Sequence, residues 1–257
     1  MKYLLATTGT IEAGVGFKMF DGCHLAWLGG IALFLLAMCL LYRRLGLKGR
    51  RIMRYVIAGA VLADEALKMA VLFIGGNFTV NYLPLHLCSI NLFLIAWHAL
   101  RPSRVLDNYL YAVCVPGALA ALLFPSWTAL PPSSLMHIHS FTFHALLVCY
   151  PLMLLLAGEI QPRLSTVPRV LLLLGSLGCI AAIANRLLGT NFMFLSYASK
   201  SNPLYWFKKN WGNHLLGYAV ILPVLLAGLY GPELVRFARR LHRAHGWRRG
   251  GKSGKIA

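Results

Sequence analysis

Four kinds of side chain that could do chemistry stand inside apolar stretches of this sequence. Cys88 carries a thiol and His144 an imidazole, while the carboxylates of Asp64 and Glu65 are followed by the amine of Lys68. A thiol that meets an imidazole from another helix can act as a nucleophile with its base. Buried carboxylates beside an amine can instead bind an ion or a polar headgroup. The sequence thus admits a covalent and a binding interpretation.

Cys88 stands near the predicted start of an apolar helix. Pro84 fits the first helical position, where no N–H is needed, and the positive end of a helix favours a thiolate within its first turn. His86 is two residues away and points to the opposite side, whereas Asn91 shares the face of Cys88. On residue chemistry alone, a small packing residue is the favoured interpretation of this cysteine.

The charged group at residues 64–68 is expensive inside a membrane. An ionisable side chain at the centre of a spanning helix costs roughly 2.5–3.5 kcal/mol on insertion scales. Lys68 lies four residues after Asp64 and three after Glu65, so it can pair with either along one helix face. A self-neutralised pair and a functional site both fit this spacing.

The composition excludes a soluble enzyme and a disordered chain. Of 257 residues, 58 % are hydrophobic and only 12 % charged, whereas a soluble domain has roughly 45–50 % and 25 %. The formal charge of +18 would suggest nucleic acid as a partner, but most of the charge lies between long apolar runs. The sequence therefore predicts an all-α, polytopic membrane protein that binds no nucleic acid.

Spanning helices need about 20 apolar residues, and seven segments qualify. They lie at 24–42, 55–74, 83–100, 108–124, 141–157, 169–187 and 212–230. This pattern predicts an N-terminal outer segment at 1–23, a seven-helix membrane domain at 24–230 and a basic cytoplasmic tail at 231–257.

The basic residues orient the predicted bundle. One set of loops and the tail take 18 of the 25 Lys and Arg residues, and such an excess marks the cytoplasmic side. The opposite side holds only Lys2, Lys18, Lys200, Lys208 and Lys209. We therefore predict an outside N-terminus, a cytoplasmic C-terminus, anionic lipid at the tail and a bacterial plasma membrane as the location.

Polar residues of four spans or their ends gather in the outer half of this predicted bundle. They are Lys68, His86, Cys88, Asn91, His144, Arg186 and Asn191. An outward-opening polar pocket is expected there. His137 and His139 are expected in a loop that faces water, and the aromatic stretch at 188–211 forms either an interfacial belt or a lid.

Three short motifs carry a family resemblance. The stretch LPLHLCS at 83–89, FH at 143–144 and NFMFL at 191–195 resemble, in order and spacing, the YwaF-type integral membrane proteins, whose vertebrate relative is transmembrane protein 164. The resemblance runs from the second to the seventh span. It implies a cysteine-dependent phospholipid acyltransferase, with Cys88 as nucleophile, His144 as base and Asn191 bonded to a carbonyl oxygen or headgroup.

The implied reaction passes through an acyl-cysteine at the outer leaflet, formed from a membrane phospholipid and passed to a lysophospholipid or another alcohol. Water as acceptor would make the protein a lipase. Asn91, Asn191 and Lys68 are the predicted oxyanion donors. The predicted substrate contacts are Lys68, His86, Asn91, Arg186 and Asn191.

Two other functional classes of membrane protein are also compatible with the sequence. A non-catalytic transporter or lipid-binding protein would use Asp64, Glu65 and Lys68 as its site. A haem or metal protein would draw on the histidines, but no known ligand spacing is present, so no cofactor and no metal are predicted.

Overall fold

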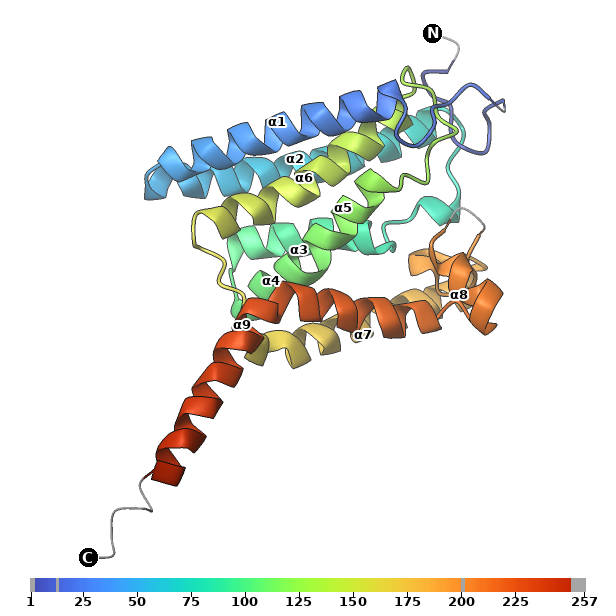
Figure 1. The fold of residues 1–257 in the computed structure, drawn as a ribbon. Helices are drawn as coiled ribbons and strands as arrows, with labels where there is room; N and C mark the ends of the chain where they lie inside the picture. The colour runs from blue at the N-terminus through green and yellow to red at the C-terminus, as the bar shows by residue number, and fades with distance from the viewer. Residues whose placement is uncertain (1–2, 13, 200–201, 251–257) are drawn as a thin grey trace, which may run out of the picture.

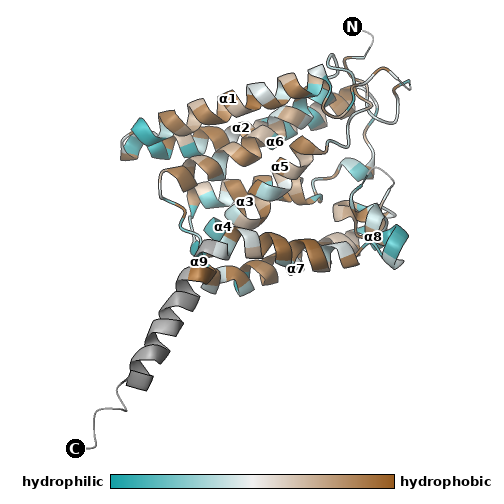
Figure 2. Cartoon of the chain, in the orientation of Figure 1, coloured by the Kyte–Doolittle hydropathy of each residue, from teal (hydrophilic) through white to brown (hydrophobic). Residues whose placement is uncertain are grey.

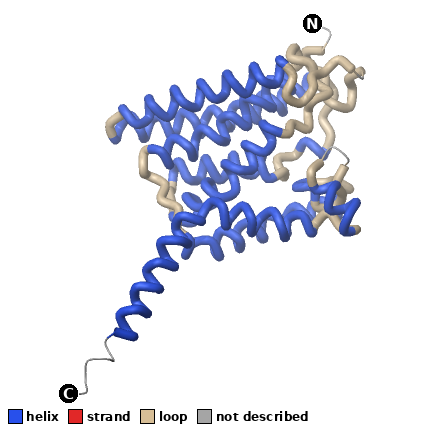
Figure 3. The backbone as a smooth tube through the Cα atoms, in the orientation of Figure 1, coloured by secondary structure: helices blue, strands red, loops and turns tan. Residues whose placement is uncertain are grey.

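The structure of the chain, a computed structural model, describes residues 3–12, 14–199 and 202–250. In these residues, helices alternate with loops gathered at the two ends of the bundle (Figure 3). The prediction of an all-α protein is confirmed for this part of the chain.

Most of the described residues lie in nine α-helices. They are α1 (Gly22–Arg44), α2 (Leu47–Ile74), α3 (Leu87–Leu100), α4 (Arg104–Tyr109), α5 (Val115–Leu123), α6 (Leu135–Leu156), α7 (Val167–Leu188), α8 (Leu204–Trp211) and α9 (Leu216–Gly250). A π-helical turn, η2 (Leu110–Cys114), joins α4 to α5, and 3-10 turns form η1 (Val80–Tyr82), η3 (Leu164–Thr166) and η4 (Phe192–Phe194).

Four helical segments of the described chain are long and apolar enough to cross a membrane: Gly22–Arg44, Arg104–Leu123, Leu135–Leu156 and Leu164–Leu188. Two shorter apolar helices lie at Leu87–Leu100 and Leu216–Gly231. Hydrophobic residues line most of the helix lengths and hydrophilic ones gather at the ends (Figure 2). The seven-span count and the orientation of the termini stay predictions.

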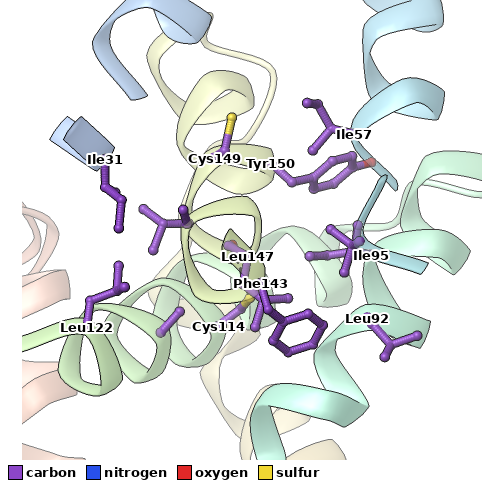
Figure 4. Close-up of a cluster of buried hydrophobic side chains, with 14 of the residues drawn as sticks. Ile31, Ile57, Leu92, Ile95, Cys114, Leu122, Phe143, Leu147, Cys149 and Tyr150 are labelled. Carbon is purple, nitrogen blue, oxygen red and sulfur yellow. Dashed lines mark hydrogen bonds between the residues drawn. The ribbon is translucent and has the colours of Figure 1, made fainter. Parts of the chain in front are cut away.

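Helix α6 lies at the centre of the bundle. It packs against α1, α2, α3 and α5, while α4 packs against α7. In Figure 1, α1 and α2 run along one side of the bundle and α7 and α9 along the opposite side. Figure 4 shows the core between them, in which Leu147 of α6, Leu92 of α3 and Cys114 of η2 belong to one buried cluster.

Helix α3 begins later than its sequence predicts. Leu83 is extended, as expected for a residue before proline, and His86 (φ −69°, ψ 151°) is the N-cap. The prediction that Pro84 opens the helix is therefore wrong, because the first helical residue is Leu87. Cys88 is thus the second residue of α3 and stands closer to the positive end of the helix than expected.

Helix α6 begins six residues before its predicted bound of 141, because the N-terminal segment folds over its start. The N–H of Leu135 donates to the carbonyl of Leu4 (2.9 Å), and the N–H of Phe17 donates to Thr128 (2.9 Å). Gly16 permits this approach, since a Cβ there would lie 2.0 Å from the carbonyl oxygen of Thr128.

This covering corrects the prediction for two histidines. His137 is fully buried and His139 is 7 % exposed, so neither faces water as a loop residue. Both lie in the first turns of α6.

The predicted basic tail at 231–257 begins as a continuation of α9, which runs to Gly250. Residues 251–257, Lys2 and Lys200 lie outside the described residues. Anionic lipid binding by the tail stays a prediction.

Candidate functional site

The thiol of Cys88 occupies the first turn of α3 and is only partly buried. Cys88 packs against the main core cluster. The first N–H groups of a helix have no intrahelical partner, and together they stabilise a nearby negative charge. The helix N-terminus therefore favours a thiolate at this position, whereas packing against the apolar core opposes it, because burial disfavours the charged form.

His144 is partly buried on α6, and its two ring nitrogens have different roles. Nδ1 lies 2.6 Å from the carbonyl oxygen of Ser140, and because a carbonyl only accepts, Nδ1 carries the proton. The ring stacks on Trp127, with 5.2 Å between centroids and 15° between planes. In the neutral ring, Nε2 therefore keeps its lone pair and can act as a base.

The helices that carry these two residues are in contact, since α3 packs against α6. Among the described residues, however, the hydrogen bonds of His144 do not include one to the thiol of Cys88. Catalytic hydrogen bonds are often long before substrate binds. Proton transfer between the two side chains needs a closer approach or an intervening water.

Two completely buried polar side chains lie close to Cys88 in the fold. They belong to Asn91 and Tyr109. Among the described residues, the amide oxygen and nitrogen of Asn91 and the hydroxyl of Tyr109 have no hydrogen-bond partner. Tyr109 lies on α4, which packs against α3, the helix that carries Cys88 and Asn91. Nothing in the sequence distinguishes Tyr109 from the other tyrosines of the apolar segments.

The predicted pairing of Lys68 with a carboxylate occurs, and it belongs to a larger network between α2 and α6. Lys68 forms an ion pair with Glu65. His139 lies 3.5 Å from Asp64 and 3.9 Å from Glu65, and Thr142 donates to Asp64 (3.0 Å). Buried charges in proteins need such partners.

His86 points toward the loop after α7. Its Nδ1 accepts a hydrogen bond from the N–H of Met193 (3.4 Å), and its ring meets Phe192 edge-on (5.3 Å). The amine of Lys68 donates to the carbonyl of Tyr82 (3.5 Å), four residues before His86 in the chain. Substrate contacts by Lys68 and His86 stay predictions.

Two other predicted contact residues have different surroundings. The side chain of Asn191 organises its own loop, because Nδ2 donates to Tyr197 (2.9 Å) and Oδ1 accepts from Ser196 (3.0 Å) and Tyr197 (3.1 Å). Arg186 is exposed in the last turn of α7. Substrate contacts by either residue stay predictions.

A groove of about 590 Å³ runs between α1 and α6. Its walls are mainly apolar and include Trp27, Ile31 and Phe34 from α1 and Leu146 from α6. Thr142, which bonds Asp64, also lines it. Since concave apolar surfaces are the usual places for apolar ligands, this groove has the chemistry of an acyl-chain site.

A second polar cluster lies farther along α3. His98 is 2.9 Å from the hydroxyl of Tyr150 through Nδ1 and 2.8 Å from Asp107 through Nε2. His98 is ten residues beyond Cys88, a rise of about 15 Å along a helix. This cluster joins α3, α4 and α6 away from the thiol.

Comparison of the chain with known proteins gives one match, to a protein family. A family model described as the TMEM164 family matches residues 19–230, which include every helix from α1 to α8. No curated protein and no solved structure matches the chain.

Proposed function

This chain belongs to the TMEM164 family, as its motifs predict, and we propose on that basis that it transfers acyl chains between membrane lipids through Cys88. The observation that carries the proposal is the state of His144. Its Nδ1 donates to the carbonyl of Ser140, which leaves Nε2 as a base on a helix that packs against α3.

The reaction has two halves. The proton of the Cys88 thiol passes to Nε2 of His144, and the sulfur adds to the ester carbonyl carbon of a phospholipid. The carbon–oxygen bond to the glycerol then breaks, and the leaving lysolipid takes the proton from His144. The products are an acyl-cysteine and a lysolipid.

The second half returns the enzyme to its starting state. An acceptor hydroxyl gives its proton to His144 and adds to the thioester carbon. The carbon–sulfur bond breaks, and the thiolate regains the proton. A lysophospholipid as acceptor gives transfer between lipids, whereas water gives a lipase.

Apolar surfaces of the bundle support the lipid character of the substrate. The groove between α1 and α6 has apolar walls, and large side chains such as Leu33 and Leu172 are more than two-thirds exposed on the outside of the bundle. A lipid membrane would cover both the apolar groove and the exposed apolar side chains on the outside of the bundle. We place the reaction at the outer leaflet of a bacterial plasma membrane.

The test is label transfer in reconstituted vesicles. The donor is phosphatidylcholine with an isotopically labelled acyl chain, and the acceptor is lysophosphatidylcholine. Cys88→Ala should abolish transfer. His144→Asn should lower it about 100-fold, the smaller end of the usual effect of a general base.

Cys179→Ala, at an exposed cysteine of α7, is the matched control and should transfer at the wild-type rate. Transfer by Cys88→Ala at the wild-type rate would overturn the proposal.

The network between α2 and α6 favours a second candidate, a non-catalytic lipid-binding or transport protein. Asp64, Glu65 and Lys68 sit beside His139, and charged groups within spanning segments usually mark a site for an ion or headgroup. If this candidate is correct, the wild-type protein transfers no label between the lipids. Cys88→Ala should then bind lysophosphatidylcholine as tightly as the wild-type protein does, whereas Lys68→Met should not bind it.

A further inference from the structure

We infer that the hydroxyl of Tyr109 and the amide of Asn91 form the binding site for the carbonyl oxygen of the acyl ester beside Cys88. This inference rests on the proposed acyl transfer and adds Tyr109 as a further catalytic residue. Its basis is a pair of buried polar side chains, on the packed helices α3 and α4, that have no hydrogen-bond partner among the described residues.

Asn91 is the first part of this site. Its side chain is completely buried, and both Oδ1 and Nδ2 lack a hydrogen-bond partner among the described residues. Leaving a buried amide unpaired is costly, and native structures rarely do so without a role for the group. Asn91 lies three residues after Cys88, one helical turn along the same face.

Tyr109 is the second part. It is also completely buried, its hydroxyl has no partner in the part of the chain that the structure describes, and it belongs to a small cluster against which Leu87 and Leu94 of α3 pack. These leucines stand one turn before and one turn after Asn91, so the tyrosine packs against α3 at the level of the amide. Helix α4, which carries Tyr109, packs against α3, which carries Cys88 and Asn91.

The backbone after Tyr109 also fits a site. Residues Leu110–Cys114 form a π-helical turn, a feature that is rare and frequently found at functional sites. The turn ends at Cys114, whose thiol donates to the carbonyl of Leu147 (3.5 Å). Cys114 is thereby bonded to α6, whereas Tyr109 and Asn91 keep free donors.

The chemistry needs these donors at one step. As the sulfur of Cys88 adds to the carbonyl carbon, the carbonyl oxygen gains negative charge, and the O–H of Tyr109 and an N–H of Asn91 donate to it. When the bond to the leaving lysolipid breaks, the oxygen becomes a carbonyl again within the thioester. Donors fixed in a buried site stabilise such an oxyanion more than donors in water do.

The experiment compares two reactions of the same thiol. Acylation of Cys88 by phosphatidylcholine vesicles forms an oxyanion, whereas alkylation by iodoacetamide forms none. We expect Tyr109→Phe and Asn91→Leu each to slow acylation about 100-fold, as loss of one oxyanion donor does. Alkylation of Cys88 should proceed at the wild-type rate in both variants.

Asn91→Leu has a second readout. Since the amide is unpaired, its replacement by an apolar group of similar size should leave the unfolding temperature at or above the wild-type value. The matched control is Tyr111→Phe, which removes a hydroxyl that donates to Leu229 (2.8 Å) and should not slow acylation.

The outcomes separate this inference from the proposed function. If the wild-type protein forms acyl-Cys88 and Tyr109→Phe forms it equally fast, the oxyanion site is wrong and acyl transfer stands. A parallel loss of acylation and alkylation would also overturn the site, because it indicates a disturbed thiol. A wild-type protein that forms no acyl-Cys88 overturns the acyl transfer itself.

Discussion

The hydroxyl of Thr142 donates a hydrogen bond of 3.0 Å to the carboxylate of Asp64 and so joins α6 to α2 in the interior of the bundle. His139, one turn earlier on α6, lies 3.5 Å from the same carboxylate. Polar contacts of this kind hold helices together in a membrane, where no hydrophobic effect drives their association. The rotation of α6 that they fix also sets the direction of His144.

Removal of this hydroxyl should loosen the α2–α6 contact. Thr142→Val keeps the shape of the side chain, and we expect it to lower the free energy of unfolding by about 0.6 kcal/mol, the average measured for hydrogen bonds between membrane helices, and by no more than about 1.7 kcal/mol. A denaturation curve in mixed micelles measures the change. Ser176→Ala is the control, because that hydroxyl bonds within its own helix, to Leu172; equal stability of both variants would contradict this role.

The stability of the protein should fall more when one member of the Glu65–Lys68 ion pair is removed than when both charges are removed. Lys68→Met leaves a buried carboxylate without its cation, and we expect a loss of about 3–5 kcal/mol in the free energy of unfolding. The double variant with Glu65→Gln should recover most of that loss, because neither charge remains. The same denaturation curves give both values, and an equally unstable double variant would refute the pairing argument.

The cluster around His98 should affect stability and not chemistry. Tyr150→Phe removes the hydroxyl 2.9 Å from His98 and should cost about 1–3 kcal/mol, as expected when a buried group loses its partner. Acyl transfer should continue at the wild-type rate, since His98 lies about 15 Å along α3 from the thiol. Loss of transfer with unchanged stability would show that this cluster takes part in the reaction.

Asp21, the N-cap of α1, should make a pH-dependent contribution to the stability of the folded protein. The main-chain N–H groups of His24 and Lys18 donate to Asp21 at 2.9 and 2.8 Å, and these bonds lower the pKa of its carboxyl below the ordinary value. A carboxyl whose pKa is lower in the folded state stabilises that state above the unfolded pKa, about 4, and loses this effect as the pH falls through the folded pKa.

We therefore expect Asp21→Ala to unfold at a lower temperature than the wild type at pH 6, with the gap closing as the pH falls toward 3. Thermal unfolding at several pH values measures it. Asp21→Asn keeps an acceptor that does not titrate and serves as the control. A gap that stays constant from pH 6 to pH 3 would rule out the carboxylate as its source.

The sequence predicts the long helices well, because about 20 apolar residues in a row leave few alternatives to a helix. The predicted segments 24–42 and 169–187 correspond to α1 and α7, whose observed bounds are Gly22–Arg44 and Val167–Leu188. The late prediction of the start of α6 falls where a loop covers a helix end. Such contacts join residues far apart in the chain, as Leu4 and Leu135 are, and no local pattern reports them.

For the candidate site, the sequence predicts contacts within one helix but not contacts between helices. The spacing of Lys68 and Glu65 predicts their pairing because it depends on one helix alone. The approach of His139 to that pair depends on the packing of α6 against α2, and the place of Tyr109 depends on the packing of α4 against α3. Neither leaves a signal in hydropathy or spacing.

The central claim is that Cys88 carries the acyl group, and the mass of the protein tests it most directly. Wild-type protein, incubated with phosphatidylcholine vesicles and quenched in acid before acceptor is added, should gain the mass of one acyl chain on the peptide that contains Cys88. Hydroxylamine at neutral pH should remove it, as it removes thioesters, and Cys88→Ala should gain nothing. An unmodified Cys88 under these conditions, or an equal gain in Cys88→Ala, would contradict the account.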